Sequence, residues 1–379
     1  MAEFPALDQL DQSIVRALQL NGRASWKQIA KAIGSAESTV TRRGQQLLSS
    51  RAVSVTAVID HLRCGLGVSI YIRFRARPGR VLELAEAIAS LSAPRFVTLT
   101  IGSFDVVAEV VVESHRDILS VTDELKQNEN ILETESMVVM RKFSAFEEWH
   151  PGQFDDDATR LLRNGGAATH YGHRDWITPE RLTPQEFEIA GILAADGRAT
   201  YAAVAAAVGI SESTAARRVE SLVSRGCLRF RTLFEAPIIG LDVEFMLWLA
   251  VDPSRIETIG EALSQHPATR YASATTGQFN LILQGVLSSY GELYIFMTQT
   301  IGRLAGVLSA DLTLQGQTLK RAWVPIDRGG RPLGSAVTPF HDAHRPEQNL
   351  RLPAPTPISP SRTGRTTARR PNPKTRARS

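Results

Sequence analysis

The sequence predicts an α+β protein in which one folding unit occurs twice along the chain. Three observations predict this fold. Several motifs recur at one constant interval, each copy begins with a pattern of three short amphipathic helices, and each copy continues with alternating strands and helices. A chain of 379 residues is also too long for one ordinary core, so several domains are expected.

The repeat is carried by three motifs. Leu18-(x3)-Gly22-Arg23-Ala24 recurs as Leu193-(x3)-Gly197-Arg198-Ala199, Gly34-(x2)-Glu37-Ser38-Thr39-(x2)-Arg42-Arg43 recurs as Gly209-(x2)-Glu212-Ser213-Thr214-(x2)-Arg217-Arg218, and Gly102-Ser103-Phe104-Asp105 recurs as Gly277-Gln278-Phe279-Asn280. Each pair is separated by 175 residues, and no gap is needed from the first motif to the last. A period of this length indicates duplicated domains rather than a solenoid.

Each copy opens with three predicted helices. In copy one, apolar residues recur at helical spacing up to Leu18, and Asn21-Gly22 ends the helix. A second helix follows Ser25, and a turn containing Gly34 leads to a third helix that runs to Leu48. Copy two repeats the pattern after Thr183-Pro184, with Thr200, Gly209 and Val223 at the matching positions. This is the helix-turn-helix arrangement, predicted over residues 7–60 and 182–235.

The third helix of each copy carries the candidate DNA contacts. Small hydroxyl residues near its N-terminus allow close approach to DNA, and the following arginines can reach phosphates or guanine edges. The predicted contacts are Ser38, Thr39, Thr41, Arg42 and Arg43 in copy one, and Ser213, Thr214, Arg217 and Arg218 in copy two. A single Arg pair would fit any solvated helix. Its recurrence at the same position of both copies favours DNA contact.

Alternating residues follow each third helix, at 53–58 and 228–233. They predict a strand that serves as the wing of a winged helix-turn-helix domain or as a connecting strand.

The second module of each copy has the order β-α-β-β-α-β, which is the ferredoxin-like pattern. It is predicted over residues 66–142 and 241–323. Such a sheet leaves one face uncovered, and two copies can cover it by facing each other. Gly102 and Gly277 fall in the turn between the two central strands, where a left-handed or closely approached backbone is expected.

The combination of these motifs resembles the Lrp/AsnC family of bacterial and archaeal regulators. The resemblance covers residues 7–142 and 182–323. Its carriers are Leu10-Asp11-(x2)-Ile14-(x3)-Leu18-(x2)-Asn21-Gly22-Arg23, then Glu37-Ser38-Thr39-(x2)-Arg42-Arg43, then Ile101-Gly102-Ser103-Phe104-Asp105. It implies a sequence-specific transcriptional regulator that binds double-stranded DNA and responds to a small molecule, an amino acid or related metabolite.

The resemblance also implies an effector site near the Gly-x-x-Asp turn, between paired modules. The residues carried over are Thr100, Gly102, Ser103, Phe104 and Asp105, with Thr275, Gly277, Gln278, Phe279 and Asn280 as their counterparts. Asp105 can pair with an ammonium group, or it can simply cap its own turn. Asn280 cannot supply that charge, so two pockets would differ in selectivity.

The copies also differ in their third helices. Ala36 stands where Ser211 supplies an N-cap, and Gly44 stands mid-helix where copy two has Val219. The first of these helices is therefore predicted to be the less stable. Relatives are usually single units that form homodimers, whereas a tandem chain can form an intramolecular pseudo-dimer with asymmetric DNA sites. The formation of higher homo-oligomers is left as an alternative.

Charge is concentrated at the C-terminal end. Residues 328–379 hold eleven Lys and Arg against two acidic residues, so the rest of the chain is net negative despite the overall charge of +4. This segment is predicted to be disordered, and to attract DNA without sequence preference or merely to solubilise the chain. The linker, residues 143–181, holds three histidines without metal-ligand spacing, and a helical turn is expected at 155–162.

The remaining features predict a cytoplasmic protein without membrane spans, cofactor or metal. No apolar run is long enough to span a membrane, and the N-terminus lacks signal-peptide features. Cys64 and Cys227 have no metal-type spacing, and no structural disulfide is expected.

Two other functions remain open. Sirohaem decarboxylases resemble the same two-module architecture, but His61, His115 and His266 do not recur at the repeat interval, so no catalytic residue is predicted. A ligand sensor that acts through protein partners is the other alternative, favoured by the net negative body of the chain.

Overall fold

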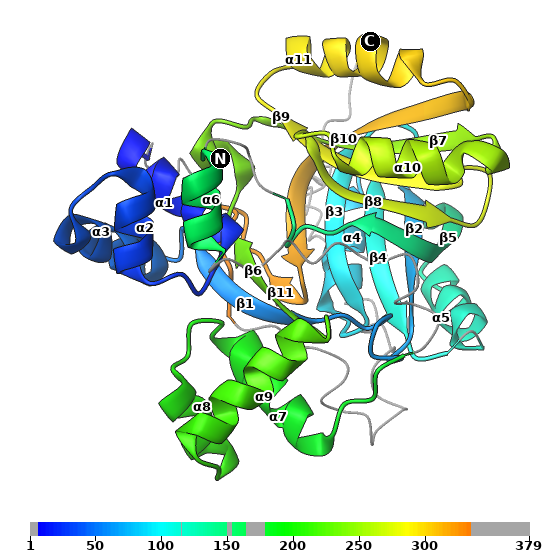
Figure 1. The fold of residues 1–379 in the computed structure, drawn as a ribbon. Coiled ribbons are helices and arrows are strands. Elements are labelled where there is room, and N and C mark those ends of the chain that lie inside the picture. The colour runs from blue at the N-terminus through cyan, green and yellow to red at the C-terminus, as the bar shows by residue number, and fades with distance from the viewer. Residues whose placement is uncertain (1–6, 115, 150–153, 164–178, 335–379) are drawn as a thin grey trace, which may run out of the picture.

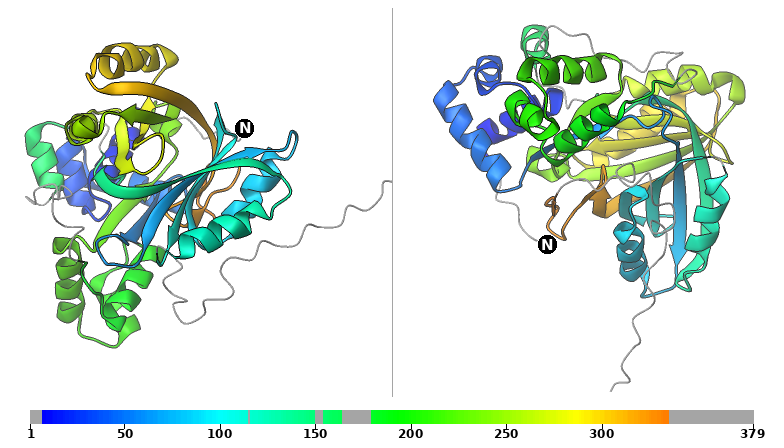
Figure 2. Two further views of the ribbon diagram at one scale, coloured as in Figure 1. Left: turned by 90° about the vertical axis from the view of Figure 1, so that its right-hand side faces the viewer. Right: turned by 90° about the horizontal axis from the view of Figure 1, so that it is seen from below.

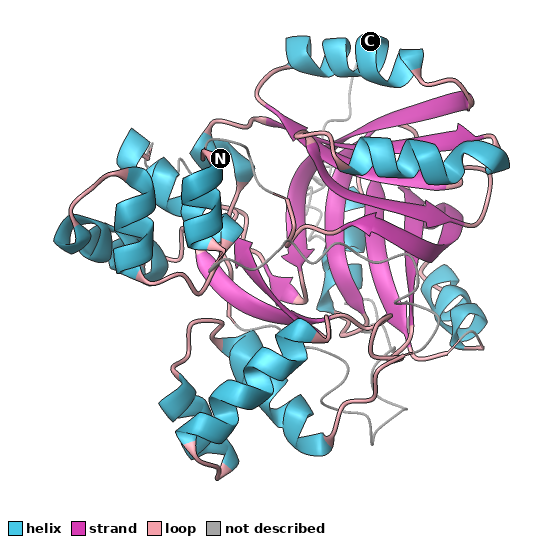
Figure 3. Cartoon of the chain, viewed as in Figure 1, coloured by secondary structure: helices cyan, strands magenta, loops and turns pink. Residues whose placement is uncertain are grey.

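A computed structural model describes residues 7–114, 116–149, 154–163 and 179–334 (Figure 1). The basic segment is predicted to be disordered from residue 328, but residues 328–334 are ordered: Ile326 bridges Pro332, and the Asp327 amide donates to the Arg331 carbonyl at 2.9 Å. Its remainder from residue 335 and the linker histidines His150, His170 and His173 lie outside the described residues, so the predictions made for them stay predictions. The described chain forms two three-helix lobes on one side of a strand-rich body, coloured by element type in Figure 3. None of its helices combines the length and apolar character that a membrane crossing demands.

The lobes are the predicted helix-turn-helix units. Copy one contains α1 (Gln9–Leu20), α2 (Trp26–Ile33) and α3 (Glu37–Ser49), and copy two contains α7 (Pro184–Ala195), α8 (Tyr201–Val208) and α9 (Glu212–Ser224). Asp8 caps α1 by accepting a hydrogen bond from the Asp11 amide at 2.9 Å. Gly34 and Gly209 adopt left-handed backbones after α2 and α8, with φ of 66° and 72°, which a side chain would disfavour.

The strands that follow the third helices form one ribbon shared by the two copies. Strand β1 (Ser54–Ile59) pairs antiparallel with β6 (Leu228–Leu233), from Ser54 opposite Leu233 to Ile59 opposite Leu228. Of the two predicted roles, these strands therefore serve as connecting strands: among the described residues, neither forms a wing hairpin within its own unit. Each strand finds its partner in the other copy because the duplicated units face each other across a pseudo-twofold axis.

The ribbon also exchanges core residues between the copies. Ala57 and Ile59 of copy one pack in the core of the second helical lobe. Phe234 and Ile239 of copy two pack in the core of the first. Each helical lobe therefore completes its core with residues from the other half of the chain.

The two βαββαβ modules close into one barrel. Copy one supplies β2 (Val68–Ala76), α4 (Val81–Ser90), β3 (Pro94–Ile101), β4 (Val106–Val112), α5 (Asp117–Lys126) and β5 (Ile131–Ser144). Copy two supplies β7 (Val243–Val251), α10 (Ile256–Ser264), β8 (Thr269–Thr275), β9 (Leu281–Leu287), α11 (Tyr290–Ile295) and β10 (Val307–Arg321). Within each copy the predicted order is confirmed.

Two strand pairings join the copies into this barrel. Strand β5 pairs with β8, and β10 pairs with both β7 and β3, so the ring of strands is β10-β3-β4-β2-β5-β8-β9-β7 and back to β10. Closure leaves the two modules without open edges toward each other. The two views of Figure 2 show the strands curving around this shared interior, with the helices outside.

Side chains alternate between the two faces of each strand. In β2, Ile70, Ile72 and Phe74 lie in a core beneath α4 and α5, whereas Tyr71 lies in the core inside the barrel. In β7, Trp248 also lies inside the barrel. The barrel interior is therefore the interface between the two repeats.

The second module continues past residue 323, where it is predicted to end. Strand β10 turns at Ala322 and Trp323, both with positive φ, into the short strand β11 (Val324–Pro325). The last helix of copy two contains a five-residue π turn after Ile295. The expected helical turn in the linker is α6 (Asp156–Leu162), which packs on the first lobe through the fully buried Leu162.

Candidate nucleic-acid interface and effector site

The third helix of each lobe presents part of its predicted DNA-contact set to solvent. Ser38 and Arg42 of α3 are exposed, and Ser213 and Arg217 of α9 occupy the same positions and are exposed as well. The predicted residues Thr39, Thr41, Arg43, Thr214 and Arg218 are half-buried. Two hydroxyls have local partners, because Thr41 donates to the Glu37 carbonyl at 2.8 Å and Thr214 bonds the N-cap Ser211 at 2.8 Å.

Arg43 and its counterpart Arg218 differ in their partners. The Arg43 guanidinium forms ion pairs with Asp8 at 2.7 Å and with Asp11 at 2.8 Å. In copy two these acidic positions are Thr183 and Glu186, and Glu186 pairs with Arg225 instead. Within the described chain, Arg218 forms no ion pair. The two third helices therefore present different charge to a ligand.

Reciprocal contacts fix the two lobes relative to each other. Arg23 donates to the Gly197 carbonyl at 2.7 Å, and Arg198 donates to the Ala24 carbonyl at 3.0 Å. Thr56 donates to the Ala194 carbonyl at 2.7 Å, and Thr232 donates to the Leu18 carbonyl at 2.6 Å.

Each of these four contacts runs from one copy to the other, two in each direction. Together with these contacts, the β1–β6 ribbon joins the two lobes and sets the spacing of α3 and α9.

The difference at position 44 has a packing explanation. A Cβ on Gly44 would overlap the Trp26 ring, whose Cε3 would lie 2.9 Å away and two further ring carbons closer still. Copy two has Tyr201 and Val219 at these positions. The glycine was expected only to weaken α3. The structure shows that it makes room for a larger ring.

The predicted effector turns have nearly identical hydrogen bonding in both copies. The Thr100 hydroxyl donates to the Phe104 carbonyl at 2.8 Å, and the Thr275 hydroxyl donates to the Phe279 carbonyl at 2.9 Å. Gly277 has a φ of 96°, and Gly102 is instead closely approached by Thr313. Gly102, Ser103, Gly277 and Gln278 are exposed.

Asp105 and Asn280 hold the end of a neighbouring strand. Asp105 accepts a hydrogen bond from the Ala76 amide at 2.8 Å, and Asn280 accepts one from the Val251 amide at 2.8 Å. Asn280 also donates to the Val251 carbonyl at 2.7 Å. Both residues therefore have a structural role, but Asp105 bonds the end of β2 rather than capping its own turn.

Arg73 brings the two turns together, and sequence reasoning missed it. Its guanidinium carbon lies 4.5 Å from the centre of the Phe104 ring and 5.1 Å from that of Phe279. The same guanidinium pairs with Glu135 of copy one and Asp311 of copy two. The sequence did contain a clue. The residue that corresponds to Arg73 in copy two is Trp248, so the two copies differ here between a charged and an aromatic side chain.

A second buried network lies deeper in the barrel. Glu109 accepts hydrogen bonds from Ser69 at 2.8 Å and Tyr71 at 3.3 Å, and Arg95 lies 3.4 Å away. Its counterpart Gln284 donates to the Tyr71 hydroxyl at 3.0 Å.

The two histidines in the described residues, His61 and His266, lie in different surroundings. His61 Nε2 lies 2.8 Å from the Ser69 hydroxyl, and burial, followed by the charges of Lys142 and Arg95, lowers its pKa well below the usual value. His266 stacks edge-on against Phe296, outside the barrel. His115 lies outside the described residues. No group of three or more metal-ligating side chains occurs in the described part of the chain.

Comparison with known proteins gives the family. A model of the AsnC-type helix-turn-helix domain matches residues 7–48 and 187–223, and a model of the Lrp/AsnC ligand binding domain matches residues 69–148 and 244–322. An uncharacterised HTH-type transcriptional regulator of Pyrococcus furiosus is 31% identical over 135 residues, which are 35% of this chain and 91% of that protein. The chain belongs to the Lrp/AsnC family.

Other relatives agree with a duplicated Lrp/AsnC unit. The regulator FL11 of Pyrococcus horikoshii is 27% identical over 36% of this chain and 90% of its own length. One unit here thus corresponds to almost a whole relative.

A solved structure matches both units at once. The siroheme decarboxylase NirDL covers 83% of this chain and 93% of its own, with a TM-score of 0.53 and 16% identity. This likeness shows that the tandem Lrp/AsnC fold is shared.

Proposed function

We propose that the chain is a sequence-specific DNA-binding transcriptional regulator of the Lrp/AsnC type. The observation that carries the proposal is the symmetric placement of α3 and α9. Both helices carry exposed Arg and Ser side chains, and the β1–β6 ribbon fixes them on opposite sides of one pseudo-twofold axis. Helix-turn-helix dimers contact two half-sites with the same arrangement.

The two helices bind unequal half-sites. Arg42 and Arg217 are exposed in both copies, but Arg43 is held by two carboxylates and Arg218 is not. The half-site contacted by α9 therefore receives the stronger phosphate or base contacts. The expected operator is an imperfect palindrome.

We further propose that an amino acid or related metabolite binds at the Gly102–Asp105 and Gly277–Asn280 turns. Their exposed backbone lies at the seam where Arg73 joins the two copies. A ligand that contacts both turns would favour one arrangement of the copies over another. Binding there would change the affinity for DNA through the paired modules.

A mobility-shift assay with DNA from upstream of neighbouring genes tests the first proposal. Wild-type protein is compared with Arg42→Ala, with Arg217→Ala, and with Arg80→Ala as the control, because Arg80 is an exposed arginine just before α4 that pairs with Glu83. We expect specific binding to weaken in the first two variants and to persist in the control. Loss of about 1–3 kcal/mol per base-contacting arginine is typical.

Equal binding by all four proteins would overturn the assignment of these helices. Turnover of sirohaem by the same preparation, without specific DNA binding, would favour the enzyme alternative.

A further inference from the structure

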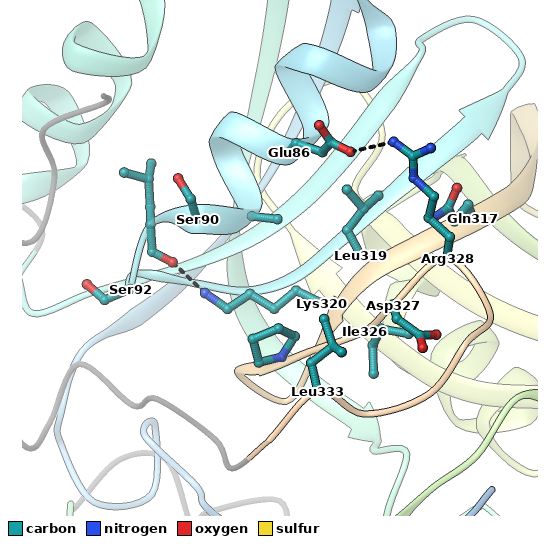
Figure 4. Close-up of a pocket in the computed structure, with 13 residues that line it drawn as sticks. Glu86, Ser90, Ser92, Gln317, Leu319, Lys320, Ile326, Asp327, Arg328 and Leu333 are labelled. Carbon is teal, nitrogen blue, oxygen red and sulfur yellow. Dashed lines mark hydrogen bonds and ion pairs between the residues drawn. The ribbon is translucent and has the colours of Figure 1, made fainter. Parts of the chain in front are cut away.

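A cavity of about 530 Å³ lies outside the barrel, away from both proposed sites (Figure 4). Its walls come from the end of α4, from β10 and from the segment after β11. This volume falls within the range of small-molecule sites. The cavity is lined by Glu86, Ala89, Ser90, Leu91, Ser92, Gln317, Leu319, Lys320, Pro325, Ile326, Asp327, Arg328 and Leu333.

Lys320 supplies a buried positive charge to this cavity. The residue is 3% exposed, and its ammonium donates to the Leu91 carbonyl. Within the described part of the chain, no carboxylate lies within ion-pair distance of it. Burial lowers the pKa of Lys320 to about 8, because the apolar surroundings disfavour the charged form. An ammonium has three donors, so two remain for a ligand.

The acidic side chains of the cavity wall have other partners. Glu86 pairs with Arg328 at 3.3 Å, and both side chains are more than half exposed at the rim. Asp327 accepts hydrogen bonds from the Gly329 and Arg331 amides, each at 2.8 Å. The cavity therefore offers apolar walls, one uncompensated ammonium inside and a guanidinium at its edge.

We propose that this cavity binds a small organic anion with an apolar body, whose carboxylate lies at Lys320. Ion pairing would compensate the buried charge, and Leu319, Ile326 and Leu333 would contact the apolar part. The segment beyond Gly334 is a poor occupant, because it holds nine Lys and Arg against two acidic residues and would repel the ammonium.

The segment 323–326, whose end lines the cavity, also contacts the β1–β6 ribbon between the helical lobes. Trp323, Val324 and Ile326 share a buried cluster with Val58 of β1 and Leu233 of β6. A ligand in the cavity would thus contact a wall that continues directly to the connection between the lobes.

Octanoate is the probe for a calorimetric test on the full chain without DNA, and 1-octanol is its uncharged match. We expect octanoate binding to be accompanied by proton uptake at pH values near the pKa of Lys320, and the affinity to fall at higher pH. Titrations in buffers of different ionisation enthalpy measure the proton uptake. Lys320→Met keeps the chain length without the charge, and should weaken octanoate roughly tenfold or more while 1-octanol is unaffected. Lys27→Met, on the exposed surface of α2, should change nothing.

Ser90→Trp at the rim of the cavity provides a second variant, in case Lys320→Met does not fold. It should block both probes by filling the cavity. Absence of octanoate binding, equal binding of octanoate and 1-octanol, or undiminished octanoate affinity in folded Lys320→Met would each overturn the proposal. These outcomes do not depend on DNA binding.

Discussion

The indole ring of Trp26 occupies the space that a side chain at Gly44 would need. The pair lies between α2 and α3 of the first lobe, and the Arg198 guanidinium of copy two lies 4.5 Å from the centre of the same ring. Gly44 therefore supports a contact between the copies as well as one within the lobe. Copy two uses Tyr201 and Val219 at the matching positions.

Replacing Gly44 by Val should destabilise the protein. Helix propensity alone predicts a small gain, but the Trp26 ring would have to leave its place, and overpacking of this kind costs about 1–3 kcal/mol. Chemical denaturation measures the free energy of unfolding. The double variant Trp26→Tyr with Gly44→Val reproduces the copy-two pair and should recover part of the loss. A more stable single variant would contradict this packing argument.

Replacing Ala36 by Ser should stabilise the first lobe. Ala36 has no side-chain cap, yet its backbone is extended, with φ of −69° and ψ of 133°, close to the geometry at Ser211. An added hydroxyl can therefore accept a hydrogen bond from the start of α3, for a gain of about 1 kcal/mol. Ser211→Ala is the matched reverse change and should cost a similar amount. Thermal unfolding of both variants tests this prediction: Ala36→Ser should raise the melting temperature and Ser211→Ala should lower it.

The repeat and the order of elements could be predicted because they depend on local patterns. Glycine terminators such as Gly34 and Gly209, and the gap-free interval between motifs, are visible in the sequence alone. The pairing of β1 with β6 could not be predicted in this way. A strand next to a helix-turn-helix unit has the same alternating pattern whether it pairs within its unit or across the repeat.

The effector site shows the same limit. The turns around Asp105 and Asn280 could be located by motif, but Arg73 connects them only after the barrel has closed. Arg73 lies two residues after Tyr71 on β2, so the sequence alone places both side chains on the same face of the strand. Its partners Glu135 and Asp311 are far apart in sequence and meet only in three dimensions.

The pH dependence of stability should have a contribution from Glu148. Burial raises the pKa of this carboxyl to about 7, against the attraction of Arg229, which lies 3.0 Å away, and with the repulsion of Glu147. The unfolded value is near 4.5, so the folded state binds the additional proton between these limits. Stability from this group is therefore lost as pH rises from about 4.5 through 7.

Glu148→Gln should remove this contribution, so that the free energy of unfolding falls less between about pH 5 and pH 8 than in the wild type. Urea denaturation across that range measures the difference. The exposed Glu83→Gln serves as the control and should leave the slope unchanged. A variant with the wild-type slope would exclude Glu148 as its source.

Releasing Arg43 should strengthen DNA binding by the first lobe. Asp8→Asn with Asp11→Asn removes both ion-pair partners, and Asn still serves as an N-cap for α1. The freed guanidinium becomes available to a phosphate, which should steepen the dependence of log affinity on log salt by about 0.9. Binding titrations at several salt concentrations measure this slope. Adding Arg43→Ala to the double variant should cancel the gain, since the mechanism requires that guanidinium. A gain that survives the third substitution would instead come from removing negative charge near DNA, and Arg43 would then have no part in the contact.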